Sequence, residues 1–193
     1  MRSSARGYAS SGRIWRRLCH AGLVRFVRYP RVDMSITPQK GNFSYVGFQY
    51  YTLTWCCFEG QDLFTQRDHV ELVRAQFLRA SAETQVVDIV HCYMPDHVHQ
   101  VVKGDSPDAD ARVYIRKAKQ YSGYYFQHQY KVKLWLRKGF NHVVLDGREY
   151  LAAVKYVIEN PLRAGLVNRV EDYPFTGSAT YTIEELKKIA YGV

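Results

Sequence analysis

The sequence predicts an α+β fold in which an antiparallel sheet is covered by helices on one face. Short runs rich in β-branched and aromatic residues alternate with segments whose apolar residues recur at helical spacing. Two of the runs are separated by little more than a Pro-Asp pair at 95–96, which is typical of a turn between adjacent strands. Strands joined partly by a hairpin and partly by helices are typical of the α+β class.

The first half of the predicted domain contains three strands and one helix. The strands are rich in Val, Ile, Tyr and Thr and are expected at 50–58, 85–93 and 97–103. A helix over 68–79, with apolar residues at helical spacing, connects the first strand to the second. The turn at 94–96 connects the second strand to the third.

The second half of the predicted domain contains two helices and a short strand. Ser106, followed by proline and aspartate, has the character of a helix cap, and this helix is expected to reach Tyr121 or beyond. A strand is expected at 141–145. A last helix is expected over 147–159, and Pro161 is expected to help terminate it.

Length and composition are those of one globular domain preceded by a basic segment. The chain has 193 residues, of which 47% are hydrophobic, and no apolar run approaches the roughly 20 residues that cross a bilayer. Residues 1–33 contain eight arginines and one acidic residue, whereas the rest of the chain holds 19 basic and 17 acidic residues. We therefore divide the chain into a basic extension, a domain and a partly helical tail, at 1–41, 42–178 and 179–193.

The basic extension has several possible origins. It is expected to be disordered or a start-site artefact, and its arginine- and serine-rich composition is also that of a transit peptide or a nucleic-acid-binding arm. The four cysteines form no CxxC pair, which favours a reducing compartment and no disulfide framework. We expect a cytoplasmic monomer or homodimer without a membrane partner.

Two histidines in the third predicted strand are candidate metal ligands. His97 and His99 stand at positions i and i+2 of a strand, so they share one face while Val98 faces the other way. Two imidazoles on one face can bind one divalent ion. The pattern is also compatible with chance alternation of polar residues, because the chain contains seven histidines.

A tyrosine and an asparagine in the last predicted helix form a second candidate group. At about 100° per residue, Leu151, Val154 and Ile158 share one side of this helix. Tyr156 and Asn160 fall on roughly the opposite side, one turn apart. This spacing pairs a phenol nucleophile with an amide oxygen that can bind a metal, although a packing tyrosine would show the same pattern.

These two groups belong to segments that resemble a known family. The segments at 94–99 (MPDHVH), 156–167 (YVIENPLRAGLV) and 172–175 (DYPF), in this order, resemble the REP-associated tyrosine transposases, which are single-tyrosine HUH transposases. The resemblance covers about 45–178 and implies a ferredoxin-like antiparallel sheet with helices packed mainly on one face. Gln100 departs from the family pattern, because that position usually carries an apolar residue.

The resemblance implies a role for each matching residue. Tyr156 would be the nucleophile, and His97, His99 and Asn160 would hold a divalent metal, Mg or Mn. The implied activity is cleavage and rejoining of single-stranded DNA near hairpins formed by palindromic repeats, through a 5′-phosphotyrosine intermediate. Imidazole ligands favour manganese, whereas magnesium is the more abundant ion in cells.

DNA binding is expected to depend on basic residues and on aromatic rings. The cations expected to contact phosphates are Arg116, Lys117, Lys119, Lys133, Arg137, Lys138 and Arg163. The rings expected to stack on unpaired bases are Tyr121, Tyr124, Tyr125, Tyr130 and Trp135. Solvated helix faces and packed tyrosines would give the same composition.

Two other functions remain open at this point. The chain could be a non-catalytic module that binds single-stranded nucleic acid and has kept the fold alone. It could also be a metal-dependent hydrolase in which the histidine pair works with Asp88 or Asp96 and an activated water. The hydrolase would remain active without Tyr156.

Overall fold

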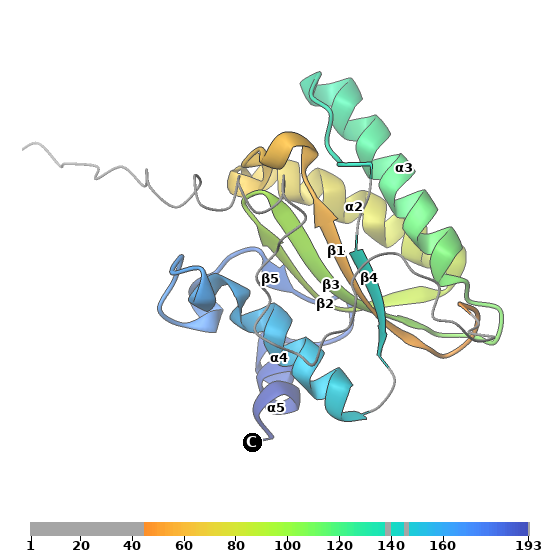
Figure 1. Cartoon of the computed structure of the whole chain (residues 1–193), viewed down its shortest axis with the longest axis vertical. Helices are drawn as coiled ribbons and strands as arrows, with labels where there is room; N and C mark the ends of the chain where they lie inside the picture. The colour runs from red at the N-terminus through yellow and green to blue at the C-terminus, as the bar shows by residue number, and fades with distance from the viewer. Residues whose placement is uncertain (1–44, 138–139, 145–146, 193) are drawn as a thin grey trace, which may run out of the picture.

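The computed structural model describes residues 45–137, 140–144 and 147–192 (Figure 1). The predicted extension at 1–41 and the predicted DNA-binding residue Lys138 lie outside these residues. The strands are β1 (Tyr50–Cys56), β2 (Val86–Met94), β3 (His97–Gly104), β4 (Phe140–Val144) and β5 (Thr176–Gly177). The helices are α2 (Arg67–Thr84), α3 (Ala111–Tyr130), α4 (Gly147–Arg163) and α5 (Ile183–Tyr191), with short 3-10 turns at η1 (Phe58–Gly60), η2 (Leu63–Thr65) and η3 (Val170–Asp172).

The sheet has the strand order β4-β1-β3-β2-β5, and every neighbouring pair is antiparallel. The chain runs β1-α2-β2-β3-α3-β4 through the first four of these strands, which is the ferredoxin-like arrangement predicted from the sequence. Strand β3 lies at the centre. His99 is therefore flanked by Thr54 of β1 and Cys92 of β2.

Helices cover both faces of the sheet (Figure 1). Helices α2 and α3 pack on the face that carries Val98 and Val102, as the predicted one-sided arrangement requires. Helices α4 and α5 cover the opposite face, where Val101 contacts the cluster that contains Val157 of α4 and Leu186 of α5. The expected arrangement differs here because β3 is buried on both faces, so each face has a cover. Within the described residues, no helix is long and apolar enough to span a bilayer.

The start of α3 differs from the sequence expectation. Asp110, and not Ser106, is the N-cap, and its side chain accepts hydrogen bonds from the backbone N–H groups of Arg112 and Val113 at 2.8 and 3.2 Å. The Ser106 hydroxyl instead donates to Gln85 at 2.6 Å. A carboxylate satisfies the first helical N–H groups and complements the helix dipole, which explains the later start.

The end of α4 also differs from expectation. Pro161 lies inside the helix, which continues to Arg163. A proline in the last turn removes a single backbone donor, so the helix extends two residues further before Gly165 adopts a positive φ of 67°.

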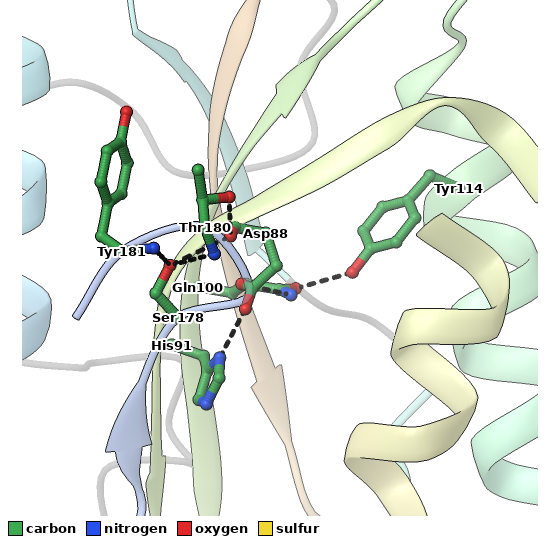
Figure 2. A network of polar contacts seen from close by, with 7 residues as sticks. All are labelled: Asp88, His91, Gln100, Tyr114, Ser178, Thr180 and Tyr181. Carbon is green, nitrogen blue, oxygen red and sulfur yellow. Dashed lines mark hydrogen bonds and ion pairs between the residues drawn. The ribbon is translucent and has the colours of Figure 1, made fainter. Parts of the chain in front are cut away.

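A buried polar network occupies the α3 side of the sheet (Figure 2). A register shift just after Asp88 places Asp88 and His91 on the same face of β2, where their side chains pair at 2.5 Å. Gln100 of β3 donates to the second Asp88 oxygen at 3.0 Å and accepts from the hydroxyl of Tyr114 in α3 at 3.1 Å. Gln100 is therefore a buried structural residue on the face opposite to His97 and His99.

The C-terminal segment is attached to the same strand. The backbone carbonyl of Asp88 accepts hydrogen bonds from the hydroxyls of Ser178 and Thr180 at 3.3 and 3.1 Å (Figure 2). Helix α5 then begins at a capping box formed by Thr182 and Glu185 and buries Leu186 completely. Helix α5, in the tail expected at 179–193, thus packs against the domain.

Candidate active site

The two histidine rings of β3 form the centre of the candidate site. The Nε2 atoms of His97 and His99 lie 3.1 Å apart, and the ring planes meet at 86°. Both side chains are buried and face α4, because the pleat of β3 directs Val98 and Gln100 to the other side. The structure therefore brings the predicted ligand pair together at one point.

The other ring nitrogens are held by neighbouring side chains. Nδ1 of His97 lies 2.6 Å from Oδ1 of Asp96, in the turn before β3. Nδ1 of His99 lies 3.1 Å from the hydroxyl of Thr54, its register partner in β1. A carboxylate that accepts from Nδ1 fixes the tautomer of His97 and leaves its Nε2 as the ligand nitrogen, an arrangement common around metal-binding histidines.

Burial keeps the His99 ring neutral. Desolvation, with smaller contributions from His97 and Arg163, holds the pKa of His99 well below its usual range. A neutral imidazole is the form that binds a metal.

The donor set fits a divalent ion. Two imidazole nitrogens bound at about 2.0–2.1 Å with angles of about 90–110° stand roughly 2.9–3.4 Å apart, which includes the separation of the two Nε2 atoms. Within the ranges that the structure describes, no group of three or more His, Cys, Asp or Glu side chains could hold a metal. A third protein ligand at this site would have to be of another residue type, such as an amide.

Tyr156 of α4 lies directly against this histidine pair. Its ring centroid is 5.2 Å from that of His99, and the rings meet edge to face at 83°. The apolar face expected for this helix, with Leu151, Val154 and Ile158, was only partly right. Val157 is fully buried, whereas Leu151 is 45% exposed. The buried face is therefore centred nearer to Val157, which places Tyr156 at its flank instead of on the opposite side.

Asn160 is buried one turn after Tyr156. Its Nδ2 atom donates to the Tyr156 carbonyl at 3.1 Å, so Oδ1 is the amide atom that remains for a cation. The roles of Asn160 as a metal ligand and of Tyr156 as the nucleophile stay predictions.

The two acids considered for a hydrolase have other partners. Asp96 pairs with Nδ1 of His97, so it lies on the side of the ring opposite to Nε2. Asp88 lies in the network with Gln100 and His91 on the other face of the sheet. Neither position favours an acid that activates water beside the Nε2 atoms.

Two of the predicted DNA-binding cations in α3 lie at an open groove. Arg116 and Lys119 line this groove, which has a volume of about 390 Å³, together with Arg112. Lys117 instead forms an ion pair with Glu83 at 2.8 Å. Burial lowers the pKa of Lys119, whose Nζ donates to the Arg137 carbonyl at 3.0 Å.

The segment that carries Lys133 and Arg137 runs past the end of β1. The backbone N–H of Leu136 donates to the carbonyl of Cys56 at 2.9 Å, and Cys56 is the register partner of His97. Both cations are exposed, and the ammonium of Lys133 lies over a phenylalanine ring. Lys119 and Arg137 thus link the α3 groove to the end of β1 that pairs with His97.

The aromatic residues expected to stack on bases divide into three sets. The hydroxyls of Tyr121 and Tyr130 donate to Glu83 and Asp68. Tyr124 and Tyr125 are 64% and 41% exposed and remain available for stacking. Trp135 is buried against Trp55, so the expectation for Trp135 was wrong. An apolar ring beside a strand edge completes the core, because burial of its area is strongly favourable.

Arg163 differs from the other predicted DNA-binding cations, because it contacts the candidate nucleophile. Its guanidinium carbon lies 4.2 Å from the centroid of the Tyr156 ring. Thr54, and the pairing of Arg163 with Glu159, were not identified from the sequence. The strand register that places Thr54 opposite His99 is not readable in one sequence, whereas the i,i+4 spacing of Glu159 and Arg163 is.

The fold and the site define a ferredoxin-like protein in which paired histidines on the central strand face a tyrosine on a covering helix. No protein-family model matches the chain. A Haemophilus influenzae protein named as a REP-associated tyrosine transposase is 21% identical over 120 residues, which cover 56% of this chain and 68% of that protein.

Solved structures give a parallel result. A REP-associated tyrosine transposase bound to a REP hairpin superposes with a TM-score of 0.59 at 18% identity, covering 78% of this chain and 82% of that one. A Deinococcus radiodurans protein described as a transposase has a TM-score of 0.45 at 16% identity and covers 63% of this chain and 96% of that one. The chain is thus similar to the REP-associated tyrosine transposases in sequence and in fold.

Proposed function

We propose that this protein is a DNA transposase of the REP-associated tyrosine type, which cleaves and rejoins single-stranded DNA beside a hairpin. The observation that carries the proposal is the edge contact between Tyr156 and His99, at 5.2 Å between ring centroids, next to two converging Nε2 atoms. A candidate nucleophile thus stands beside a candidate metal site, which is what phosphodiester cleavage by covalent catalysis requires.

His97, His99 and Asn160 are the residues that would hold a divalent ion, either Mg or Mn. When bound, such an ion supplies Lewis-acid polarisation of the scissile phosphate and neutralises the charge that develops on it. Asp96 and Thr54 orient the two rings, and the burial of His99 keeps water away from one side of the site.

The reaction assigned to Tyr156 exchanges one phosphate ester for another. The phenol oxygen attacks phosphorus and forms a 5′-phosphotyrosine, while the 3′-oxygen of the preceding nucleotide leaves and takes up a proton as a hydroxyl. The phenol proton passes to solvent, since an unperturbed phenol, with a pKa near 10, is mostly protonated at neutral pH. The ester bond energy is retained, so the same step in reverse joins the strand to a new 3′-hydroxyl.

The distribution of cations supports a path for the DNA backbone. Arg116 and Lys119 at the groove on α3 would contact phosphates of the hairpin, and Arg137 and Lys133 continue the positive charge towards the sheet edge near His97. Phosphate contacts of this kind position a nucleic acid without reading its sequence.

The test is adduct formation on a labelled single strand that carries a palindromic hairpin. The wild-type protein with Mn should give a protein–DNA adduct that survives a denaturing gel, and Tyr156→Phe should give none. Tyr150→Phe is the matched control on the same helix and should form the adduct normally. Hairpin binding without any adduct would support the non-catalytic module instead.

A further inference from the structure

Arg163 makes three contacts that converge on Tyr156 and its helix. The guanidinium lies over the Tyr156 ring at 4.2 Å. Its Nη2 donates to the Tyr156 carbonyl at 2.5 Å, and its Nη1 pairs with Oε2 of Glu159 at 3.4 Å. The side chain therefore folds back along α4 by two helical turns, from the end of the helix to the candidate nucleophile.

We propose that Arg163 is the positioning residue of the nucleophile, which holds the Tyr156 ring against His99 so that the phenol oxygen faces the metal site. This inference rests on the proposed function for its catalytic consequence. The contacts of the Tyr156 ring include the edge contact with His99 and the guanidinium of Arg163 over the ring. Together they restrict the side-chain torsions of a residue that is only half-buried.

Glu159 and the end of α5 hold Arg163 in this orientation. While Oε2 of Glu159 pairs with Arg163, its Oε1 accepts a hydrogen bond from the Tyr191 hydroxyl at 3.2 Å. The Tyr191 ring lies under the ammonium of Lys155 at 5.2 Å, one turn earlier on α4. The guanidinium is thus the last member of a chain of contacts that crosses the surface of α4.

The contacts of Arg163 distinguish it from a cation that only binds phosphate. Two of its nitrogens are engaged within the chain, and the Glu159 carboxylate offsets part of its charge. Arg116, in contrast, is exposed at the α3 groove. A planar guanidinium can stack on a ring while it donates in its own plane, and an ammonium cannot do both.

The decisive substitution is Arg163→Lys, which keeps the positive charge and removes the planar guanidinium that lies over the Tyr156 ring. At saturating hairpin DNA, we expect the single-turnover cleavage rate to fall on the order of 10- to 100-fold, as for a misplaced reacting group. The Kd for the hairpin and its salt dependence should stay unchanged. Glu159→Gln should also lower the cleavage rate, by a smaller factor. Arg169→Lys is the matched control and should leave the rate unchanged.

A second measurement reports ring position without DNA or turnover. In protein labelled on its tyrosine rings, the NMR signals of Tyr156 are identified by their loss in Tyr156→Phe. Arg163→Lys should shift these signals, because the guanidinium leaves the ring face, and Arg169→Lys should leave them in place. The thermal midpoints of both lysine variants should match that of the wild type, since all of these contacts lie at the surface of α4.

Two results would overturn the inference. One is a wild-type cleavage rate in Arg163→Lys, or, in the uncharged variant Arg163→Gln, a Kd that rises with a salt slope reduced by about one, which identifies a phosphate contact. The other is an unchanged set of Tyr156 signals in that variant. If the wild-type protein itself forms no adduct, the proposed function fails, whereas the NMR signals still decide whether Arg163 positions the ring.

Discussion

The Nε2 atoms of His97 and His99 lie 3.1 Å apart, while their Nδ1 atoms are held by Asp96 and Thr54. Two nitrogen lone pairs directed at one point repel each other unless a proton or a cation lies between them. A proton on Nε2 of one neutral ring gives a hydrogen bond at this distance, and a divalent cation would take the place of that proton in the proposed metal site. The first two predictions concern this pair and the carboxylate of Asp96.

Replacing either histidine should remove the metal site. In calorimetric titrations with Mn, the wild-type protein should bind one ion, and His97→Ala and His99→Ala should bind none at the same concentrations. His128→Ala is the matched control, because His128 is exposed on α3. Hairpin affinity should persist in the variants, since it comes mainly from distributed cations. Cleavage by the wild type in excess chelator would contradict the assignment.

The carboxylate of Asp96, which pairs with Nδ1 of His97, should raise the metal affinity of the site. Asp96→Asn keeps the shape of the side chain but removes the charge that orients Nδ1 at 2.6 Å. We expect the Mn affinity to fall about 10- to 100-fold, as for other partners behind a ligand. The same titration measures it, and a change of less than about twofold would show that Asp96 has no part in the site.

Gln100 should matter for stability and not for cleavage. In Gln100→Leu, the Tyr114 hydroxyl and one Asp88 oxygen lose their partner in a buried network, which should cost on the order of 2–4 kcal/mol in the free energy of unfolding. Adding Tyr114→Phe should recover part of this loss. Urea denaturation of the single and double variants gives the coupling free energy between Gln100 and Tyr114. Strictly additive losses in the free energy of unfolding would contradict the network.

Glu83 should make the junction of α2 and α3 sensitive to acid. Hydrogen bonds from Lys117, Tyr121 and Arg79 lower the Glu83 pKa from 4.5 to about 2. A folded-state pKa below the unfolded value adds stability above about pH 4.5 that is lost as the pH falls through about 2. The small advantage of the wild type over Glu83→Gln at pH 6 should therefore vanish at pH 2. An equal difference at both pH values would contradict the assignment.

The sequence predicted the order of strands and helices from β1 to α4 because each of these elements carries its own local pattern, whereas the two-residue strand β5 was not expected. The hairpin at 94–96 and the alternation around His97 also sufficed to place both histidines on one face. The cover on the second face was missed because β3 alone does not reveal that Val101 needs a partner from α4. The N-cap at Asp110 was missed because Ser106 offers an equally good local signal.

The site was predictable only in part, for a related reason. Tyr156 and Asn160 were found through their spacing and through a family resemblance, whereas their true place on the helix depends on Val157, which only the packed structure reveals. Thr54 depends on the register of two strands that are 45 residues apart in the chain. Contacts between distant segments leave no signal in a single sequence, and contacts within one helix turn do.

We predict that Tyr156 becomes covalently joined to DNA. Tyr150, on the same helix, is a poorer candidate, because burial raises its pKa to about 12 and its ring packs against Tyr50 in a tilted contact. The most direct test is mass spectrometry of peptides from the adduct trapped on a hairpin substrate with Mn. We predict a nucleotide on Tyr156 alone, and no adduct in Tyr156→Phe. A nucleotide on any other tyrosine, or full cleavage by the phenylalanine variant, would contradict the claim.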